Sequence, residues 1–192
     1  MRFVGAALAL SFAAGTASAA GMPVGQKLQP FKMKQATGQE LDLGSLQGRK
    51  AYVLAFIATQ CPVSNAYNTR MADFAKEYDA KGVAFIGINS NRQEPAAEVV
   101  DHAKKHGFTF PVLKDEGNAK ADEFGAQVTP EVYVFDAGWT LRYHGRIDDD
   151  RSGSAVQSQD LKAAVDAVVA GQDVRLKETK AFGCTIKRVA AQ

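Results

Sequence analysis

Sulfur is scarce in this chain of 192 residues, which contains two cysteines, Cys61 and Cys184. Basic blocks are missing too, and aromatic residues are not interleaved with basic ones. Because the formal net charge is only +2, nucleic acid is excluded as an expected partner. The sequence has neither an internal repeat nor a low-complexity tract. A composition with 46% hydrophobic residues therefore indicates a globular chain with one core.

A membrane-spanning run is also missing. The N-terminal stretch MRFVGAALALSFAAGTASAA has a basic Arg2, an apolar part over residues 3–14 and small residues up to Ala19. This order is typical of a secretory signal peptide cleaved after Ala19. The apolar part is shorter than the roughly 20 residues that a membrane span needs, and no cysteine follows it for a lipid anchor. We therefore predict a secreted or periplasmic protein, in a compartment where disulfides persist.

Apolar runs of strand length alternate with helical stripes along the rest of the chain. We expect one α/β domain over residues 20–170, followed by a tail over residues 171–192. Strands that alternate with helices, then a hairpin and a closing helix, predict a layered sandwich with a mixed sheet. The expected elements are a hairpin around residues 37–38, strands over 50–59, 82–90, 108–115, 131–136 and 141–147, helices from 64 or 65 to 82 and over 95–107, 118–125 and 159–169, and an exposed polar loop over 148–153.

Cys61 stands between the apolar run that ends at Thr59 and the following helix. The unpaired amides of a first helical turn and the partial positive charge of the helix dipole favour a thiolate there. Pro62 suits the first helical position, and Ser64 and Asn65 are residue types that favour N-caps. Cysteines placed in this way have a pKa below the free value of about 8.5. The position predicts a nucleophile, and a buried structural cysteine is the alternative.

A second signal lies in VTPEVYVFD, where a proline precedes a buried strand. Such a proline is either an ordinary strand start or a cis-proline that closes a tight turn. The segment FIATQCPVS (56–64) resembles the active-site segment of the thioredoxin superfamily, and Val128, Thr129 and Pro130 resemble its cis-proline loop. The extra strand and helix within residues 83–107 resemble the redoxin branch, which includes the alkyl hydroperoxide reductase and thiol-specific antioxidant proteins.

The resemblance covers about residues 23–170, most of the chain that follows the leader. It implies a thioredoxin-like fold and thiol redox activity, in which Thr129 and Pro130 shape the groove for a substrate sulfur or oxygen. The implied partners are protein or small-molecule thiols and disulfides, peroxides, and a thiol electron donor, and no cofactor is implied.

The sequence departs from that family's pattern at three places. Ser64 stands where a thioredoxin has its second cysteine, so a C-x-x-C disulfide is excluded. Gln60 replaces the usual tryptophan. The threonine that peroxiredoxins carry three residues before the cysteine is also missing, because position 58 is Ala58 and Thr59 comes one residue late. We therefore expect thiol–disulfide exchange, with thiol peroxidase activity as the alternative.

A nucleophilic thiolate needs a second thiol to complete turnover, and Ser64 cannot supply one. Cys184 can do so if the tail folds back over the helix start, and the surrounding residues 173–183 read as a mobile loop. The ending ETKAFGCTIKR also resembles exported redoxin-like proteins with a late cysteine. Cys184 is thus either a resolving cysteine or half of a permanent structural disulfide. Both roles require the two sulfurs to come within bonding distance.

Other polar residues suggest weaker hypotheses. His102 and His106, four residues apart on one expected helix, and His144 allow a copper-binding carrier without enzymatic activity, although soft copper prefers thiolate or thioether ligands. Arg146 ends a strand, where it either approaches Cys61 and favours the thiolate or lies on the surface. The acidic run of residues 148–150 lacks the spaced oxygen ligands of a calcium site.

Overall fold

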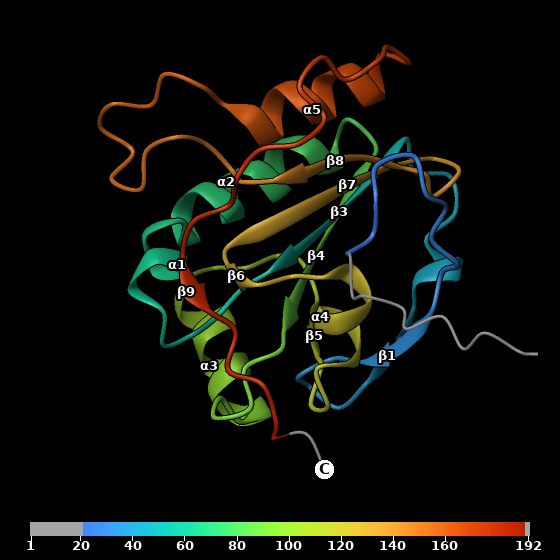
Figure 1. The fold of residues 1–192 in the computed structure, drawn as a ribbon. Helices are drawn as coiled ribbons and strands as arrows, with labels where there is room; N and C mark the ends of the chain where they lie inside the picture. Colours follow the sequence, from blue (N-terminus) through green and yellow to red (C-terminus); the bar gives the residue numbers. More distant parts are fainter. Residues whose placement is uncertain (1–20, 191–192) are drawn as a thin grey trace, which may run out of the picture.

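A five-stranded mixed sheet crosses the middle of the computed structural model, which describes residues 21–190 (Figure 1). The leader predicted over residues 1–19 lies outside the described residues. In sheet order the strands are β5 (Val112–Lys114), β4 (Val83–Asn89), β3 (Ala51–Phe56), β7 (Glu131–Asp136) and β8 (Leu141–Gly145). Strand β3 runs parallel to β4 and antiparallel to β7, so the predicted mixed sheet is confirmed.

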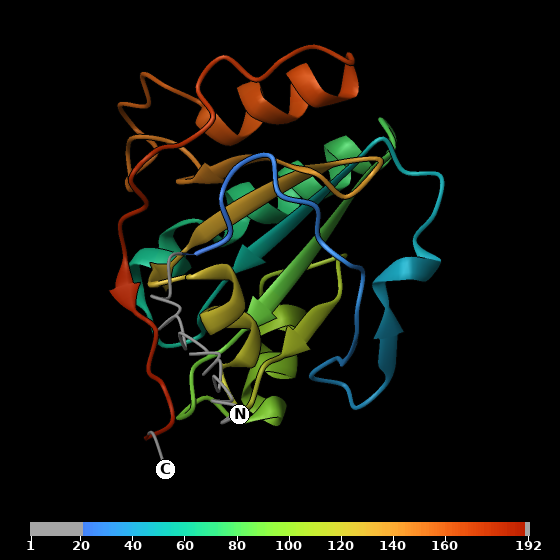
Figure 2. The same ribbon diagram turned by 45° about the vertical axis from the view of Figure 1, so that its right-hand side comes forward.

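Both faces of the sheet are covered, which explains why β3 and β4 are apolar along their whole length. Alternate side chains of a strand point to opposite faces, so Val53 and Leu54 belong to two different core clusters. Helices α2, α3 and α5 pack on the Val53 side, whereas α4 and the N-terminal segment cover the other face (Figure 2). The helices are α1 (Pro62–Ala66), α2 (Asn68–Asp79), α3 (Ala96–Lys105), α4 (Ala119–Phe124) and α5 (Asp160–Val169).

Two hairpins lie where the sequence predicts them. Strands β1 (Lys32–Lys34) and β2 (Glu40–Asp42) pair around Gly38, whose φ of 88° suits a glycine, and a 3-10 turn, η1 (Leu43–Ser45), follows. Strands β7 and β8 form the second hairpin, in which register shifts between Val134 and Phe135. Within residues 21–190, no helix has the length and apolar character needed to cross a bilayer.

The helix after β3 begins at the proline that the sequence favours for its first position, but its cap and its middle differ from the prediction. It begins at Pro62, and Cys61 is the N-cap, with an extended backbone at φ −86° and ψ 116°. The expected caps Ser64 and Asn65 therefore lie inside α1. Tyr67 separates α1 from α2, so the predicted single helix is two helices in succession. The observed cap differs from the expected one because the Cys61 sulfur accepts the amide hydrogen bond that an oxygen-bearing side chain usually takes.

The tail is not the loop that its composition indicates. A two-residue strand, β9 (Cys184–Thr185), pairs antiparallel with β6 (Val128–Thr129). The tail runs along one edge of the molecule, from α5 past α1 to α3 (Figure 1). Ile186 is buried, and its amide donates to the carbonyl of Gln127 at 2.9 Å. The tail is therefore part of the fold over this stretch, because its backbone groups find partners on the domain.

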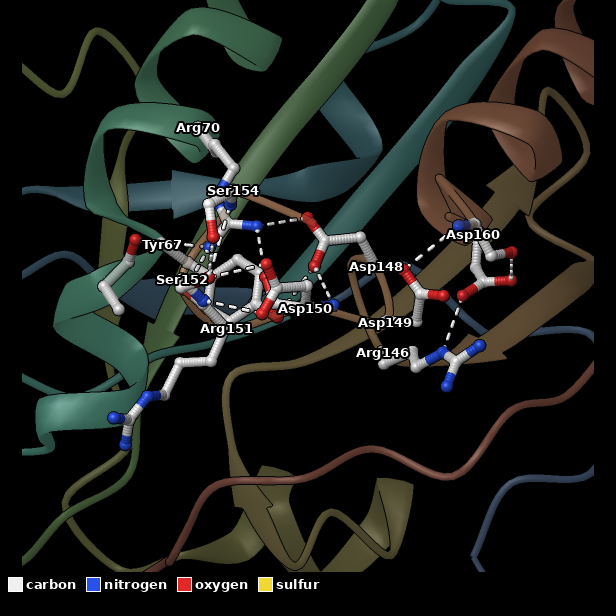
Figure 3. A network of polar contacts seen from close by, with 12 residues as sticks. Tyr67, Arg70, Arg146, Asp148, Asp149, Asp150, Arg151, Ser152, Ser154 and Asp160 are labelled. Carbon is white, nitrogen blue, oxygen red and sulfur yellow. Dashed lines mark hydrogen bonds and ion pairs between the residues drawn. The ribbon is translucent and has the colours of Figure 1, made fainter. Parts of the chain in front are cut away.

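The acidic stretch 148–153 is also less exposed than predicted. Asp148 is buried, accepts a hydrogen bond from the Tyr67 hydroxyl at 2.8 Å and forms an ion pair with Arg70 (Figure 3). The carboxylate of Asp150 accepts two backbone amides within its own loop. These carboxylates are held by donors of the protein itself, which explains why the loop is compact.

Candidate redox site

Cys61 is the last residue of the loop that connects β3 to α1, and only 4% of its surface is exposed. The amide of Ser64 donates to its sulfur at 3.3 Å, and the thiol donates to the carbonyl of Thr129 at 3.3 Å. Pro62, at the first helical position, has no amide hydrogen to leave unpaired. Because α1 has only five residues, we attribute the electrostatic effect at Cys61 to direct hydrogen bonds rather than to a long helix dipole.

Cys184 reaches the same place from the tail. In the β6–β9 pair it lies directly opposite Thr129. Hydrogen bonding from its thiol and its backbone amide is among the causes that lower the pKa of the Cys61 thiol, and both cysteines are free. Hydrogen bonding from the Val63 amide opposes the rise in the pKa of the Cys184 thiol.

The environment separates the two thiols by their acidity. Burial raises the pKa of Cys61, but the hydrogen bonds from Cys184, Ser64 and Thr129 together outweigh it, and the pKa lies below its ordinary value. Burial also raises the pKa of Cys184, and the hydrogen bond that it donates to Cys61 raises it further. The site therefore favours a thiolate on Cys61 beside a protonated Cys184.

Thr129 and Pro130 form the wall of the site opposite α1. The peptide bond between them is cis, which is one of the two possibilities that the sequence leaves open. The buried Thr129 hydroxyl has no hydrogen-bond partner among the described residues. A thiolate at Cys61 accepts this hydroxyl as a donor, which is one of the causes of its lowered pKa. Gly183 lies against the Thr129 backbone so closely that any β-carbon there would overlap the Thr129 carbonyl.

A buried carboxylate that the sequence analysis misses holds the loop before Cys61. Glu94 is fully buried and accepts the amides of Thr59 at 2.9 Å and of Gln60 at 3.0 Å. The side-chain amides of Asn89 and Asn91 donate to the same carboxylate. Four donors satisfy the buried charge, so the loop has a fixed shape. Glu94 stands in the polar stretch NSNRQEP between a strand and a helix, where nothing in the sequence marks it as buried.

Glu131 does the same for the loop that leads to Pro130. It is buried and accepts the amides of Gln127 at 2.8 Å and Val128 at 3.2 Å. His144 contacts the same carboxylate at 2.5 Å, so this histidine belongs to the support of the cis-proline loop. The sequence carries a signal for this role, since a carboxylate that opens an otherwise apolar strand directly after a proline is unusual.

Arg146 forms an ion pair at the start of α5. Its guanidinium donates to Asp160 at 2.6 Å (Figure 3). The hydrogen bond from Arg146 to Asp160 raises the pKa of the guanidinium, and none of the causes that lower the Cys61 pKa involves this arginine. The sequence gives no sign of this contact, because an irregular loop separates Arg146 from Asp160 along the chain.

The three histidines do not form a metal centre. The rings of His102 on α3 and of His106 at its C-cap are tilted, with centroids 4.4 Å apart. His102 contacts the Asn68 side chain at 3.0 Å, while His144 contacts Glu131. Across residues 21–190, no three histidine, cysteine or carboxylate side chains gather closely enough to hold a metal ion.

Comparison with known proteins points in the same direction as the geometry. The model of the AhpC/TSA family matches residues 24–144. Thiol-disulfide oxidoreductase ResA of Halalkalibacterium halodurans is 26% identical over 133 residues, which are 69% of this chain and 70% of that protein. A putative chloroplastic peroxiredoxin Q of Oryza sativa subsp. indica is 26% identical over 59% of this chain. The match spans only 54% of that peroxiredoxin.

Solved structures share the architecture over most of the chain. A hypothetical protein of Sinorhizobium meliloti is 34% identical and superposes with a TM-score of 0.83, covering 88% of this chain and 97% of its own. A secreted disulfide oxidoreductase of Mycobacterium tuberculosis, described as homologous to DsbE of E. coli, is 23% identical with a TM-score of 0.56, over 74% and 96% of the two chains. The predicted thioredoxin-like fold is thereby confirmed.

Proposed function

Because the chain belongs to the AhpC/TSA family, we propose that it is a thiol redox enzyme in which Cys61 is the nucleophile and Cys184 its partner thiol. The observation that carries this proposal is that Cys184 lies opposite Thr129, whose carbonyl accepts the thiol of Cys61. In this arrangement the pKa of Cys61 is lowered and that of Cys184 is raised. A permanent structural disulfide would not need this difference in acidity. A thiolate beside a thiol is the arrangement that attacks a substrate and then resolves the product.

The proposed reaction is thiol–disulfide exchange. The Cys61 thiolate attacks one sulfur of a substrate disulfide, forms a mixed disulfide and releases the other substrate sulfur as a thiolate. That thiolate, or a solvent base, takes the proton of Cys184. The Cys184 sulfur then attacks Cys61, closes an intramolecular disulfide and releases the second substrate thiol. An external thiol donor reduces this disulfide in the next half of the cycle.

The groove residues have a stated part in this reaction. Thr129 lies on β6 against Cys61, and Pro130 follows it through a cis peptide bond. In the proposed reaction the Thr129 hydroxyl donates to the thiolate and holds it in position for attack. The likeness to ResA, whose name describes thiol–disulfide oxidoreductase activity, supports exchange. Ser64 is fully buried and uses its hydroxyl to accept the amide of Ala58, so it is a structural residue of this site.

A thiol peroxidase is the second candidate, favoured by the likeness to peroxiredoxin Q. The Cys61 thiolate would attack a peroxide oxygen, becoming a sulfenic acid while an alcohol or water leaves. The Cys184 sulfur would then condense with the sulfenic acid, forming the same disulfide and releasing water. The position of Cys184 serves both candidates equally, whereas no observation at the histidines supports a copper carrier.

We also propose export. The pattern of residues 1–19 is that of a signal peptide, and one structural relative is described as secreted. In a periplasmic or extracellular setting, the domain over residues 20–170 and the tail over residues 171–192 would meet an oxidising environment. The electron donor there would be another protein thiol or a small thiol.

Stopped-flow assays of the reduced protein separate the two candidates. We expect rapid reaction with a small disulfide and slow reaction with hydrogen peroxide or an alkyl hydroperoxide. The Cys61→Ser variant should lose both reactions, whereas Cys184→Ser should complete only the first step. Peroxide consumption faster than disulfide reduction would favour the peroxidase. A Cys61→Ser variant as active as the wild type would reject both candidates.

A further inference from the structure

We propose that Asn91 is a positioning residue that keeps Cys184 aligned with Cys61 without touching either sulfur. This inference rests on the proposed function, because it concerns the step in which Cys184 attacks Cys61. Asn91 lies after the end of β4, with 4% of its surface exposed. Its side-chain amide has one donor end and one acceptor end, and the structure uses each for a different part of the site.

The donor end of Asn91 reaches the loop before Cys61 through one intermediate. Its Nδ2 donates to Glu94 Oε1 at 3.0 Å, and the same oxygen accepts the backbone amide of Gln60 at 3.0 Å. Gln60 immediately precedes Cys61 in the chain. The position of this loop is therefore connected to Asn91 through a single buried carboxylate oxygen.

The acceptor end of Asn91 holds the tail. Its Oδ1 accepts the backbone amide of Lys187 at 2.7 Å, three residues after Cys184. The carbonyl of Lys187 accepts the amide of Arg92 at 2.9 Å, so two hydrogen bonds fix this part of the tail to residues 91–92. Lys114 Nζ donates to the Asn91 carbonyl at 2.8 Å and restrains its backbone. The Asn91 side chain therefore connects the loop before Cys61 with the tail after Cys184.

Position 91 needs a side chain that both donates and accepts a hydrogen bond, as a carboxamide does. An aspartate would accept the Lys187 amide but could not, when ionised, donate to Glu94. An apolar residue would leave a buried carboxylate oxygen and a tail amide without these partners. Because a misplacement of about 1 Å can slow a reaction between held groups by up to a hundredfold, a loosened tail should affect disulfide closure most.

The test separates the two steps with 5,5′-dithiobis(2-nitrobenzoate), a small aromatic disulfide. Attack by Cys61 releases one nitrothiobenzoate, and closure of the 61–184 bond releases a second, so absorbance records both rates. In Asn91→Ala we expect the second release to slow by about tenfold or more while the first keeps the wild-type rate. An unchanged second release would overturn the inference, and so would equal slowing of both steps.

A matched pair of tail variants tests the same contact from the tail, at two positions whose side chains are exposed. Lys187→Pro removes the amide that donates to Asn91, and Val189→Pro removes the next tail amide bound on the domain, which donates to Asn118 at 2.7 Å. We expect Lys187→Pro to slow the second release and Val189→Pro to leave it at the wild-type rate. Equal slowing by both would assign the effect to general tail docking and overturn the role of Asn91. A wild-type protein that releases only one equivalent would instead reject the pairing of the two cysteines itself.

Discussion

Glu94 and Glu131 hold two different loops in the same way, since each is a buried carboxylate that accepts two consecutive backbone amides. Glu94 holds residues 59–60, next to Cys61, and Glu131 holds residues 127–128, next to the cis-proline loop. The two loops form the walls of the candidate redox site. Removing either carboxylate should therefore disturb the site without altering a residue that touches substrate.

Replacement of Glu94 by glutamine should destabilise the fold. The side chain keeps its size but turns one acceptor oxygen into a donor group, which then faces donors of the protein. We expect the free energy of unfolding to fall by about 3 kcal/mol, because buried donors lose their acceptor. Urea denaturation of the reduced protein measures this change. Glu77→Gln is the matched control, since Glu77 is exposed and pairs with Lys81 on the surface, and it should leave the unfolding midpoint unchanged.

Glu131 should make stability depend on pH in acid. Burial raises the pKa of its carboxyl, but the hydrogen bonds from His144, Gln127 and Val128 outweigh it and hold the pKa below its usual value. A folded-state pKa below the unfolded value contributes stability that is present above the usual glutamate pKa, about 4.3, and lost as pH falls through the folded pKa. Unfolding free energies measured between neutral and acid pH should show this loss. Glu131→Gln should be less stable at neutral pH and should show a smaller loss in acid; identical acid profiles would contradict the role of Glu131.

The hydroxyl of Thr129 should matter for the acidity of Cys61. In Thr129→Val one donor to the thiolate disappears while the shape is nearly kept, so the pKa of Cys61 should rise. The rate of iodoacetamide alkylation as a function of pH gives this pKa, and a Cys184→Ser background keeps the second thiol out of the measurement. Thr129→Ser retains a hydroxyl and should stay close to the wild type. A valine variant with an unshifted midpoint would show that the hydroxyl does not reach the thiolate.

The close approach of Gly183 to Thr129 provides a test of tail docking. A methyl group at Gly183 overlaps the Thr129 backbone carbonyl, so Gly183→Ala should move β9 away from β6 and slow formation of the 61–184 disulfide. Gly117→Ala is the control, because a β-carbon there meets nothing within 4 Å and the glycine does not have a left-handed backbone. Oxidation followed by mass spectrometry under non-reducing conditions gives the rates. Equal rates in both variants would show that the tail does not need this contact.

The fold was largely predictable because its signals are local. Strands β3, β4 and β7 are buried on both faces, and that burial produces apolar runs visible without a structure. Cys61 was predictable for a related reason, since strand ends and helix starts have sequence signals of their own. Pro62 as the first helical position is confirmed, whereas Ser64 and Asn65 were wrong as caps. The general preference for serine and asparagine gives no warning that a cysteine sulfur takes the amide hydrogen bond.

The supporting residues were harder to predict because their roles depend on contacts between distant segments. Glu94 and Asn91 read as a polar loop, and only the folded chain shows that they are buried under the loop before Cys61 and under the tail. The tail was predicted as a loop because a two-residue strand has no periodicity to detect. The partner of Arg146 could not be predicted either, because Asp160 reaches it only through the way the loop after β8 returns to the start of α5.

The most direct test of the central claim is to locate the disulfide bonds that form when the reduced protein meets a single equivalent of a small disulfide. After an acid quench, peptide mass spectrometry under non-reducing conditions should find Cys61 joined to Cys184 in the wild type and Cys61 joined to the small thiol in Cys184→Ser. The Cys61→Ser variant should carry neither bond. A small thiol attached first to Cys184, or a wild-type protein in which the 61–184 bond never forms, would contradict the assignment of Cys61 as the nucleophile and Cys184 as its partner.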